Sequence, residues 1–201
     1  MEAYQWKNRV KFITKYMFDI DNNGYLDLYD FECLALRYTV LGGKGSYDPK
    51  IHEKNKVIMI NFWNEMAELG NFNKGGQVSI DDFTQGLQNA CVGKKFSGLP
   101  NSLQDVITCK FNTIDLDGKN SSTSDGLITL EEYRLDCICW CAYKDISAID
   151  DCFNKLLSEE DKMVEGISLK RYQELYAQFL GCPGTDKAGV YLFGPISILG
   201  N

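Results

Sequence analysis

The chain has no excess of positive charge and no long apolar run. Its 201 residues include 21 Lys and Arg against 28 Asp and Glu, so the formal net charge is -7. Binding to nucleic acid or to an anionic membrane requires a basic surface, and we expect neither partner. No apolar segment reaches the roughly 20 residues that cross a bilayer. Residues 1–7 lack the apolar core of a signal peptide. We therefore expect a cytoplasmic protein.

Histidine is nearly absent, and the cysteines lack the spacing of a metal or redox site. His52 is the single histidine, and the 8 cysteines form no C-x-x-C pair, which argues against zinc and thioredoxin-like sites. Without a secretion signal we expect reduced cysteines in the core rather than disulfides. The sequence also has no nucleophile–base pairing and no phosphate-binding loop. We therefore expect no enzyme.

Four segments of the chain resemble one another: Phe18–Phe31, Gly70–Phe83, Ile114–Tyr133 and Glu165–Tyr172. Each contains a glycine, an aliphatic residue soon after it and an aromatic residue at the close. Apolar residues at helical spacing flank each segment on both sides. An internal repeat of this kind indicates one supersecondary unit used several times. The pattern predicts eight helices in four helix-loop-helix units.

The first loop, Asp19–Asp30, has an oxygen donor at every position that the calcium loop of an EF-hand uses. Such a loop draws ligands from positions 1, 3, 5, 7, 9 and 12, with glycine at position 6 for a sharp turn. Gly24 and Leu26 hold positions 6 and 8 in register. The sequence therefore predicts a Ca²⁺ site, and its expected ligands are Asp19, Asp21, Asn23, the Tyr25 carbonyl, Asp27 and Asp30.

Position 12 of this loop is Asp30, whereas calcium loops commonly have glutamate there. Aspartate is one methylene shorter, so the loop must contract to reach the cation. Mg²⁺ prefers six ligands at shorter distances than Ca²⁺ does. We therefore expect Mg²⁺ to compete with Ca²⁺ at the first loop.

The second loop, 71–82, keeps the structural residues of the pattern but has lost most of its charge. Gly76 and Val78 are in register, whereas Asp82 is the one carboxylate left at a ligand position. Because ligand charge tunes affinity, this loop is either a weak site or a structural remnant. Its candidate ligands are Asn71, Asn73, Gln77, Ser79 and Asp82.

The third loop, 115–132, is longer than the usual pattern if it starts at Asp115. An insertion among Gly118 to Ser124 is tolerable because the entropy of loop closure grows slowly with length. A competing register instead places Ser121 at position 1 and Thr123 at position 3. We expect a Ca²⁺ site in the longer register, with the ligands Asp115, Asp117, Asp125, the Leu127 carbonyl, Thr129 and bidentate Glu132.

The fourth loop, 160–171, has Lys162, Val164 and Arg171 at ligand positions 3, 5 and 12. A cation and an apolar residue cannot hold Ca²⁺, so we expect no metal here. The unit still supplies a strand and half of a core, because EF-hand loops pack in pairs. The strand pairs that we expect are Leu26 with Val78 and Ile128 with Ile167.

These units predict an all-α fold of two EF-hand pairs, with short antiparallel β contacts between paired loops. We expect the first pair in residues 1–98 and the second in residues 99–185. The apolar segment 186–201 is expected to pack back on the core, and its alternative role is that of a partner-binding strand.

Several stretches of the chain match one known family: Asn8–Lys11, Tyr16–Gly24, Asp30–Ala35, Glu132–Ile138, Arg171–Phe179 and Tyr191–Pro195. On these stretches the sequence resembles the sarcoplasmic calcium-binding proteins of invertebrates, especially those of arthropods. The resemblance implies a compact fold of two EF-hand pairs and a calcium-buffering role in muscle or neurons. In that family the second loop often binds metal.

Two other functions stay open beside a buffer. A calcium sensor exposes a Met-rich groove, whereas this chain has 5 scattered Met and 25 aromatic residues as 11 Phe, 11 Tyr and 3 Trp. Photoproteins and luciferin-binding proteins resemble this fold and hold a chromophore in the core. The single His52 argues against a photoprotein, but a carrier of an apolar small molecule stays open. We expect a monomer or homodimer without an obligate protein partner.

Overall fold

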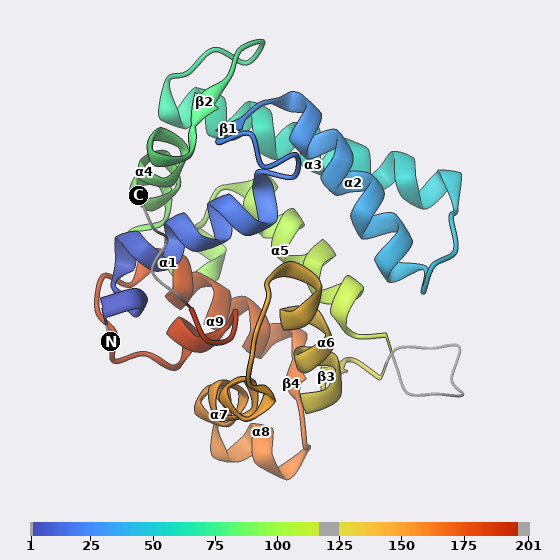
Figure 1. The fold of residues 1–201 in the computed structure, drawn as a ribbon, viewed down its shortest axis with the longest axis vertical. Helices are drawn as coiled ribbons and strands as arrows, with labels where there is room; N and C mark the ends of the chain where they lie inside the picture. The colour runs from blue at the N-terminus through green and yellow to red at the C-terminus, as the bar shows by residue number, and fades with distance from the viewer. Residues whose placement is uncertain (1, 117–124, 197–201) are drawn as a thin grey trace.

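The computed structural model describes residues 2–116 and 125–196. Figure 1 shows helices in antiparallel and crossed pairs around a shared interior. The α-helices of the described part are α1 Trp6–Ile13, α2 Leu28–Gly42, α3 Pro49–Gly70, α4 Ile80–Cys91, α5 Asn101–Ile114, α6 Leu130–Trp140, α7 Ile146–Leu156, α8 Glu159–Met163 and α9 Leu169–Gly181. The short helical turns are η1 Glu2–Tyr4, η3 Phe96–Gly98, η4 Ala188–Tyr191 and the π-helical η2 Thr14–Phe18, which continues α1.

Two short antiparallel ladders join the loops in pairs. The strands are β1 Tyr25–Leu26 with β2 Val78–Ser79, and β3 Leu127–Ile128 with β4 Ile167–Ser168. In both ladders the position-8 residues face each other as predicted: Leu26 faces Val78, and Ile128 faces Ile167. The predicted all-α fold with β contacts between paired loops is confirmed.

The fourth unit contains a helix that the periodicity did not predict. Helix α8 begins after Ser158, whose hydroxyl accepts a hydrogen bond from the Asp161 N–H at 3.2 Å. The Asp161 carboxylate accepts one in return from the Ser158 N–H at 2.8 Å. This reciprocal capping box stabilises a helix start. The prediction of eight helices was therefore wrong, because the described residues form one more short helix.

One hydrophobic core runs through both EF-hand pairs. In the first pair the rings of Phe18, Phe31, Phe62 and Phe83 pack on one another, and Trp63 lies against Phe31, with the two ring centroids 5.2 Å apart, and against Phe83. Helix α9 belongs to the second pair and packs not only against α5 of its own pair but also against α1 and α4 of the first. The loops are therefore attached to helices that share one hydrophobic core, and the packing of these helices sets the direction of the loop side chains.

Arg9 ties the first helix to the far end of the chain. Its side chain is 0% exposed and donates hydrogen bonds to the carbonyls of Phe179 at 2.8 Å and Gly184 at 3.1 Å. Further along, the Tyr133 hydroxyl donates to the Tyr191 carbonyl at 2.6 Å. Buried apolar residues continue to Ile196, where the described residues end. The segment after α9 thus covers the core as far as it is described.

The 8 cysteines are all free thiols. The prediction that they lie in the core was wrong for most of them, because Cys91, Cys137 and Cys152 are buried, four others are half-buried and Cys139 is exposed. Among the described residues, no helix combines the length and the apolar character that crossing a membrane would require.

Candidate metal centre

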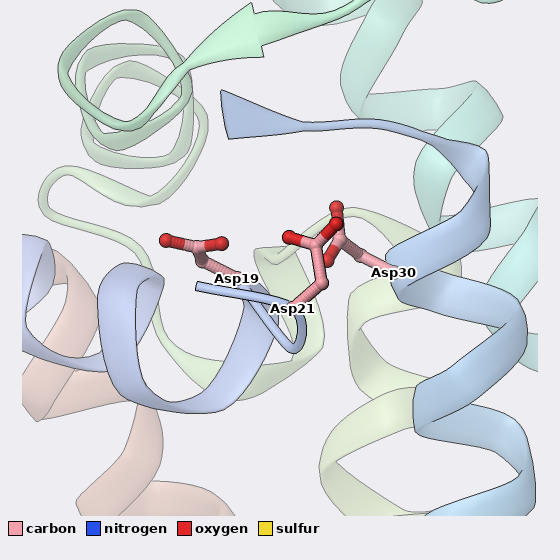
Figure 2. A group of neighbouring side chains, drawn as sticks. All are labelled: Asp19, Asp21 and Asp30. Carbon is pink, nitrogen blue, oxygen red and sulfur yellow. The ribbon is translucent and has the colours of Figure 1, made fainter. Parts of the chain in front are cut away.

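Three carboxylates of the first loop converge on one point. One oxygen from each of Asp19, Asp21 and Asp30 lies within 4.8 Å of the other two (Figure 2). Asp19 follows the π-helical end of the incoming helix, whereas Asp30 extends from the first turn of α2. Asp19 is 4% and Asp30 1% exposed, and Asp21 faces solvent. Such a convergent set of oxygens is what a hard divalent cation binds.

Asp30 has a structural role as well. Its Oδ1 accepts a hydrogen bond from the Ile20 N–H at 2.9 Å, and its Oδ2 accepts one from the Asp27 N–H at 3.0 Å. The second bond completes a capping box with Asp27 at the start of α2. Burial raises the pKa of the Asp30 carboxyl to about 6, against the lowering effect of these two N–H donors. A nearby divalent cation would favour the charged form.

Hydrogen bonds from backbone N–H groups to side-chain oxygens of the same loop stabilise the turn of the first loop. The Asp19 carboxylate accepts from the Asn23 N–H at 3.0 Å and from the Gly24 N–H at 3.2 Å. Gly24 has φ +88°, which glycine adopts without strain. The Asn23 side-chain oxygen accepts from the Tyr25 N–H at 2.8 Å. Predicted ligands at positions 1, 5 and 7 are thus linked to one another around the bend.

Asp27 connects the first loop to the second. Its Oδ1 caps α2 by accepting from the Tyr29 N–H at 2.9 Å, and its Oδ2 accepts from the Gln77 side-chain amide at 3.1 Å. Asp27 is not part of the group of three converging carboxylates. The bond to Gln77 was not predicted, because it depends on how the two loops pack.

The third loop repeats the contacts of the first at its described ends. The Glu132 carboxylate accepts from the Leu116 N–H at 2.8 Å and the Thr129 N–H at 2.9 Å, as Asp30 does in loop one. The Gly126 N–H donates to the Asp115 carboxylate at 3.2 Å, and Gly126 has φ +81°. Asp115 has φ −70° and ψ 80°, close to the φ −77° and ψ 78° of Asp19.

In the described part of the chain, fewer carboxylates converge in the third loop than in the first. Among the described residues, Asp115, Asp125 and Glu132 do not form a convergent group like that of loop one. The Asp125 carboxylate accepts from the Leu127 N–H at 2.9 Å. Predicted ligand Asp117 lies outside the described residues, as do the positions of the competing register, Ser121 and Thr123.

The second loop starts with a different backbone. Asn71 ends α3 in the left-handed region with φ 52° and ψ 45°, unlike the first residues of loops one and three. The side chains of the loop are engaged locally. The Asn73 oxygen accepts from the Gly75 N–H at 3.0 Å, and the Ser79 hydroxyl donates to Asp82 at 2.7 Å. Among the described residues, no cluster of three acidic groups occurs here.

The fourth loop holds an ion pair in place of converging carboxylates. The Arg171 guanidinium donates from Nε to the Asp161 carboxylate at 3.1 Å and from Nη2 to the Leu156 carbonyl at 3.0 Å. Asp161 was not singled out by the sequence analysis. The spacing Ser158-x-x-Asp161 is the signal that could have identified it, because it matches a capping box.

Comparison with known proteins gives close relatives over almost the whole chain. The chain is 52% identical over 194 residues to the sarcoplasmic calcium-binding protein of Scylla paramamosain, covering 96% of this chain and 97% of the relative. It is 51% identical over 194 residues to the sarcoplasmic calcium-binding protein beta chain of Penaeus sp., covering 96% and 98%.

The fold agrees with these sequence matches. The crystal structure of a sarcoplasmic calcium-binding protein from amphioxus superposes with a TM-score of 0.73 at 23% identity, covering 94% of this chain and 96% of that one. No family model matches the sequence. The identity to crustacean relatives over nearly their full length is nevertheless decisive, and the chain belongs to the sarcoplasmic calcium-binding proteins.

Proposed function

We propose that this protein binds Ca²⁺, as the names of its relatives indicate for them, and that it acts as a Ca²⁺ buffer. The observation that carries the proposal is the convergence of Asp19, Asp21 and Asp30 within 4.8 Å. Repulsion between two unit charges this close is about 1 kcal/mol in water and about 4 kcal/mol near a protein surface. A divalent cation among the carboxylates would remove that repulsion. Asn23, the Tyr25 carbonyl and Asp27 would complete the ligand set.

Loop three is the second proposed site. Its ends share the backbone conformation of loop one at position 1 and the same N–H donors to the residue at position 12. These parallels support the longer register, in which Asp115 and Glu132 are the first and last ligands. Asp117, Asp125, the Leu127 carbonyl and Thr129 would fill the positions between them.

Loops two and four are proposed to be structural. The left-handed Asn71 and the bond between Ser79 and Asp82 support a remnant rather than a tight site in loop two. In loop four the positive charge of Arg171 already balances Asp161. We accordingly keep the division into an EF-hand pair in 1–98, a second pair in 99–185 and a covering segment in 186–201.

The burial of the methionines favours a Ca²⁺ buffer over a Ca²⁺ sensor. Met17, Met59 and Met66 are at most 2% exposed and belong to the core, whereas Met163 is exposed alone on α8. A sensor needs several methionines on one groove that opens with Ca²⁺. For the carrier alternative, one cavity inside the described core is too small. A cavity lined by Phe12, Met17 and Trp140, among others, measures about 10 Å³, the least that one water needs.

The experiment that tests this function is a calorimetric Ca²⁺ titration of the full chain, repeated in millimolar Mg²⁺. We expect two tight sites, with loop one weakened by Mg²⁺ because Asp30 suits a smaller cage. Three tight sites would assign a metal to loop two as well. Weak Ca²⁺ binding that does not change when Mg²⁺ is present would contradict the buffering function. Sedimentation in the same buffers would tell a monomer from a homodimer.

A further inference from the structure

A cavity of about 780 Å³ lies away from the metal loops, between residues 93–97 and helix α9. Residues 93–97 lie between α4 and α5 and are called the connecting segment below. The volume is within the range of roughly 300 to 1,000 Å³ that is usual for small-molecule sites. None of the predicted metal ligands lines it. The calcium-binding function therefore does not account for this cavity.

Backbone contacts hold the connecting segment against the end of α9. The Gly93 N–H donates to the Gly181 carbonyl of α9 at 2.9 Å, while the Lys94 N–H donates to the Cys91 carbonyl at 3.0 Å and closes a turn at the end of α4. A Cβ at Gly181 would lie 2.3 Å from the Cys91 carbonyl oxygen, so only glycine permits this approach. The cavity wall is thus built from fixed backbone rather than from side chains alone.

The rim of the cavity is positively charged on a chain of net charge -7. Lys94, Lys95, Lys170 and Lys187 line it, with Glu174 as the one carboxylate among the lining residues. In residues 2–116 and 125–196, the first three of these lysines make no ion pair with a carboxylate. Lys187 pairs with its neighbour Asp186 at 3.3 Å, with both side chains more than half exposed. Three ammonium groups therefore remain available to an anion.

The floor of the same cavity is apolar. Phe96 is half-buried on the turn η3, and Ala177 on α9 is 4% exposed. A small inorganic anion would contact the lysines and leave this floor in water. A molecule with an apolar body and one acidic group would cover both parts. Lysine stems add apolar surface beneath their charged ends.

We propose that this cavity binds an amphipathic carboxylate, that is, an acyl chain with one carboxylate group. The carboxylate lies among Lys94, Lys95 and Lys170, and the chain covers Phe96 and Ala177. Binding is independent of Ca²⁺ at loops one and three, because the two kinds of site share no residue. The ligand stabilises the contact between the connecting segment and α9, since it binds only where both are in place.

The test is a calorimetric titration of the Ca²⁺-loaded full chain, freed of excess Ca²⁺, with sodium dodecanoate. The variant combines Lys94→Gln, Lys95→Gln and Lys170→Gln. The control combines Lys50→Gln, Lys54→Gln and Lys144→Gln, which are exposed lysines elsewhere and change the net charge equally. We expect one dodecanoate per chain, binding at least tenfold weaker to the variant and unchanged binding to the control. Ca²⁺ titrations of both should match the unsubstituted chain.

Three results would overturn the proposal. The first is no binding of dodecanoate to the unsubstituted chain. The second is equal binding of dodecanol, which would mean that the lysines do not recognise the ligand. The third is lysine-dependent binding of a poly-glutamate peptide without binding of dodecanoate, which would make the cavity a peptide site. All substituted lysines are exposed, so misfolding does not obscure these outcomes.

Discussion

Arg171 and Asp161 form an ion pair at 3.1 Å inside the fourth loop, with side chains that are 20% and 8% exposed. Arg171 stands at position 12 of the EF-hand pattern, where Asp30 stands in the first loop. One loop thus presents a carboxylate at this point, and the other presents a guanidinium. The positive charge in loop four belongs to the chain itself, so this loop needs no metal to balance its buried carboxylate.

The first prediction follows from this pair. Arg171→Gln leaves the Asp161 carboxylate partly buried without its partner. Removing one member of a buried pair costs about 3 to 5 kcal/mol, and partial exposure reduces this to about 2 kcal/mol here. Urea unfolding should record that loss of stability, while the number of bound Ca²⁺ stays the same. Lys162→Gln breaks only the exposed pair with Glu159 and should cost less than about 0.5 kcal/mol.

A gain of Ca²⁺ affinity in Arg171→Gln would contradict this account, because it would mean that loop four is a metal site blocked by Arg171.

The sequence was a good guide to the loops wherever local chemistry decides the structure. The β ladders were predicted because position 8 of each loop is aliphatic and the register allows one partner, as for Leu26 and Val78. The convergence of Asp19, Asp21 and Asp30 follows in the same way from the fixed spacing of the pattern. Helix α8 escaped prediction because its short capping box does not produce a helical stripe.

Contacts between segments that are far apart in the chain could not be predicted from the sequence. Lys110 is fully buried and pairs with Asp136, and its ammonium lies 4.4 Å from the centroid of the Trp140 ring. Nothing in the pattern distinguishes this lysine from the exposed ones. Its burial depends on the packing of α5 against α6. The cavity beside α9 is likewise formed by segments that are far apart in the chain.

The second prediction concerns this buried lysine. Asp136→Asn should lower the free energy of unfolding by about 3 kcal/mol at pH 7, because it removes the one carboxylate paired with Lys110 among the described residues. Asp105→Asn alters an exposed carboxylate on the same helix as Lys110 and should leave stability within about 0.5 kcal/mol. Urea unfolding of both variants beside the unsubstituted chain measures the difference.

The loss of stability in Asp136→Asn should depend on pH. Burial lowers the pKa of Lys110, and Asp136 opposes that effect. Below the folded-state pKa the lysine is charged and depends on Asp136. As the pH rises through that pKa the charge is lost, and the carboxylate contributes less. The cost of Asp136→Asn should therefore shrink as the pH rises toward 10.5, the ordinary pKa of lysine. A cost that is constant or grows would show that the charge of Lys110 is not what Asp136 stabilises.

The third prediction addresses selectivity at loop one. Asp30→Glu lengthens the side chain at position 12 and lets it reach the cation through both oxygens. Ca²⁺ accepts such ligation, whereas Mg²⁺ prefers the smaller octahedral cage. We expect millimolar Mg²⁺ to weaken Ca²⁺ binding about tenfold less in the variant than in the unsubstituted chain. Asp81→Glu, beside Asp82 and paired with Lys11 on the surface, should leave the competition unchanged. Equal competition of Mg²⁺ with Ca²⁺ in the unsubstituted chain and in both variants would contradict the role assigned to Asp30.

The fourth prediction separates the two registers of loop three. Asp115→Asn should abolish one of two tight Ca²⁺ sites, because Asp115 is the first ligand in the longer register. Ser121→Ala combined with Thr123→Ala should leave both sites intact. Glu132→Gln should resemble Asp115→Asn, whereas Glu131→Gln alters the exposed neighbour and should have no effect on stoichiometry. Loss of a site in the Ser121 and Thr123 variant would establish the shorter register instead.

The most direct measurement is the Ca²⁺ stoichiometry of a variant that combines Asp19→Asn and Asp21→Asn. Both substitutions preserve side-chain shape and remove two of the three charges that converge in loop one. Circular dichroism identifies the folded fraction that is titrated. The account predicts that the number of tight sites falls from two to one, with loop three still occupied. Two tight sites of unchanged affinity would contradict it, because the converging carboxylates would then not be a metal centre.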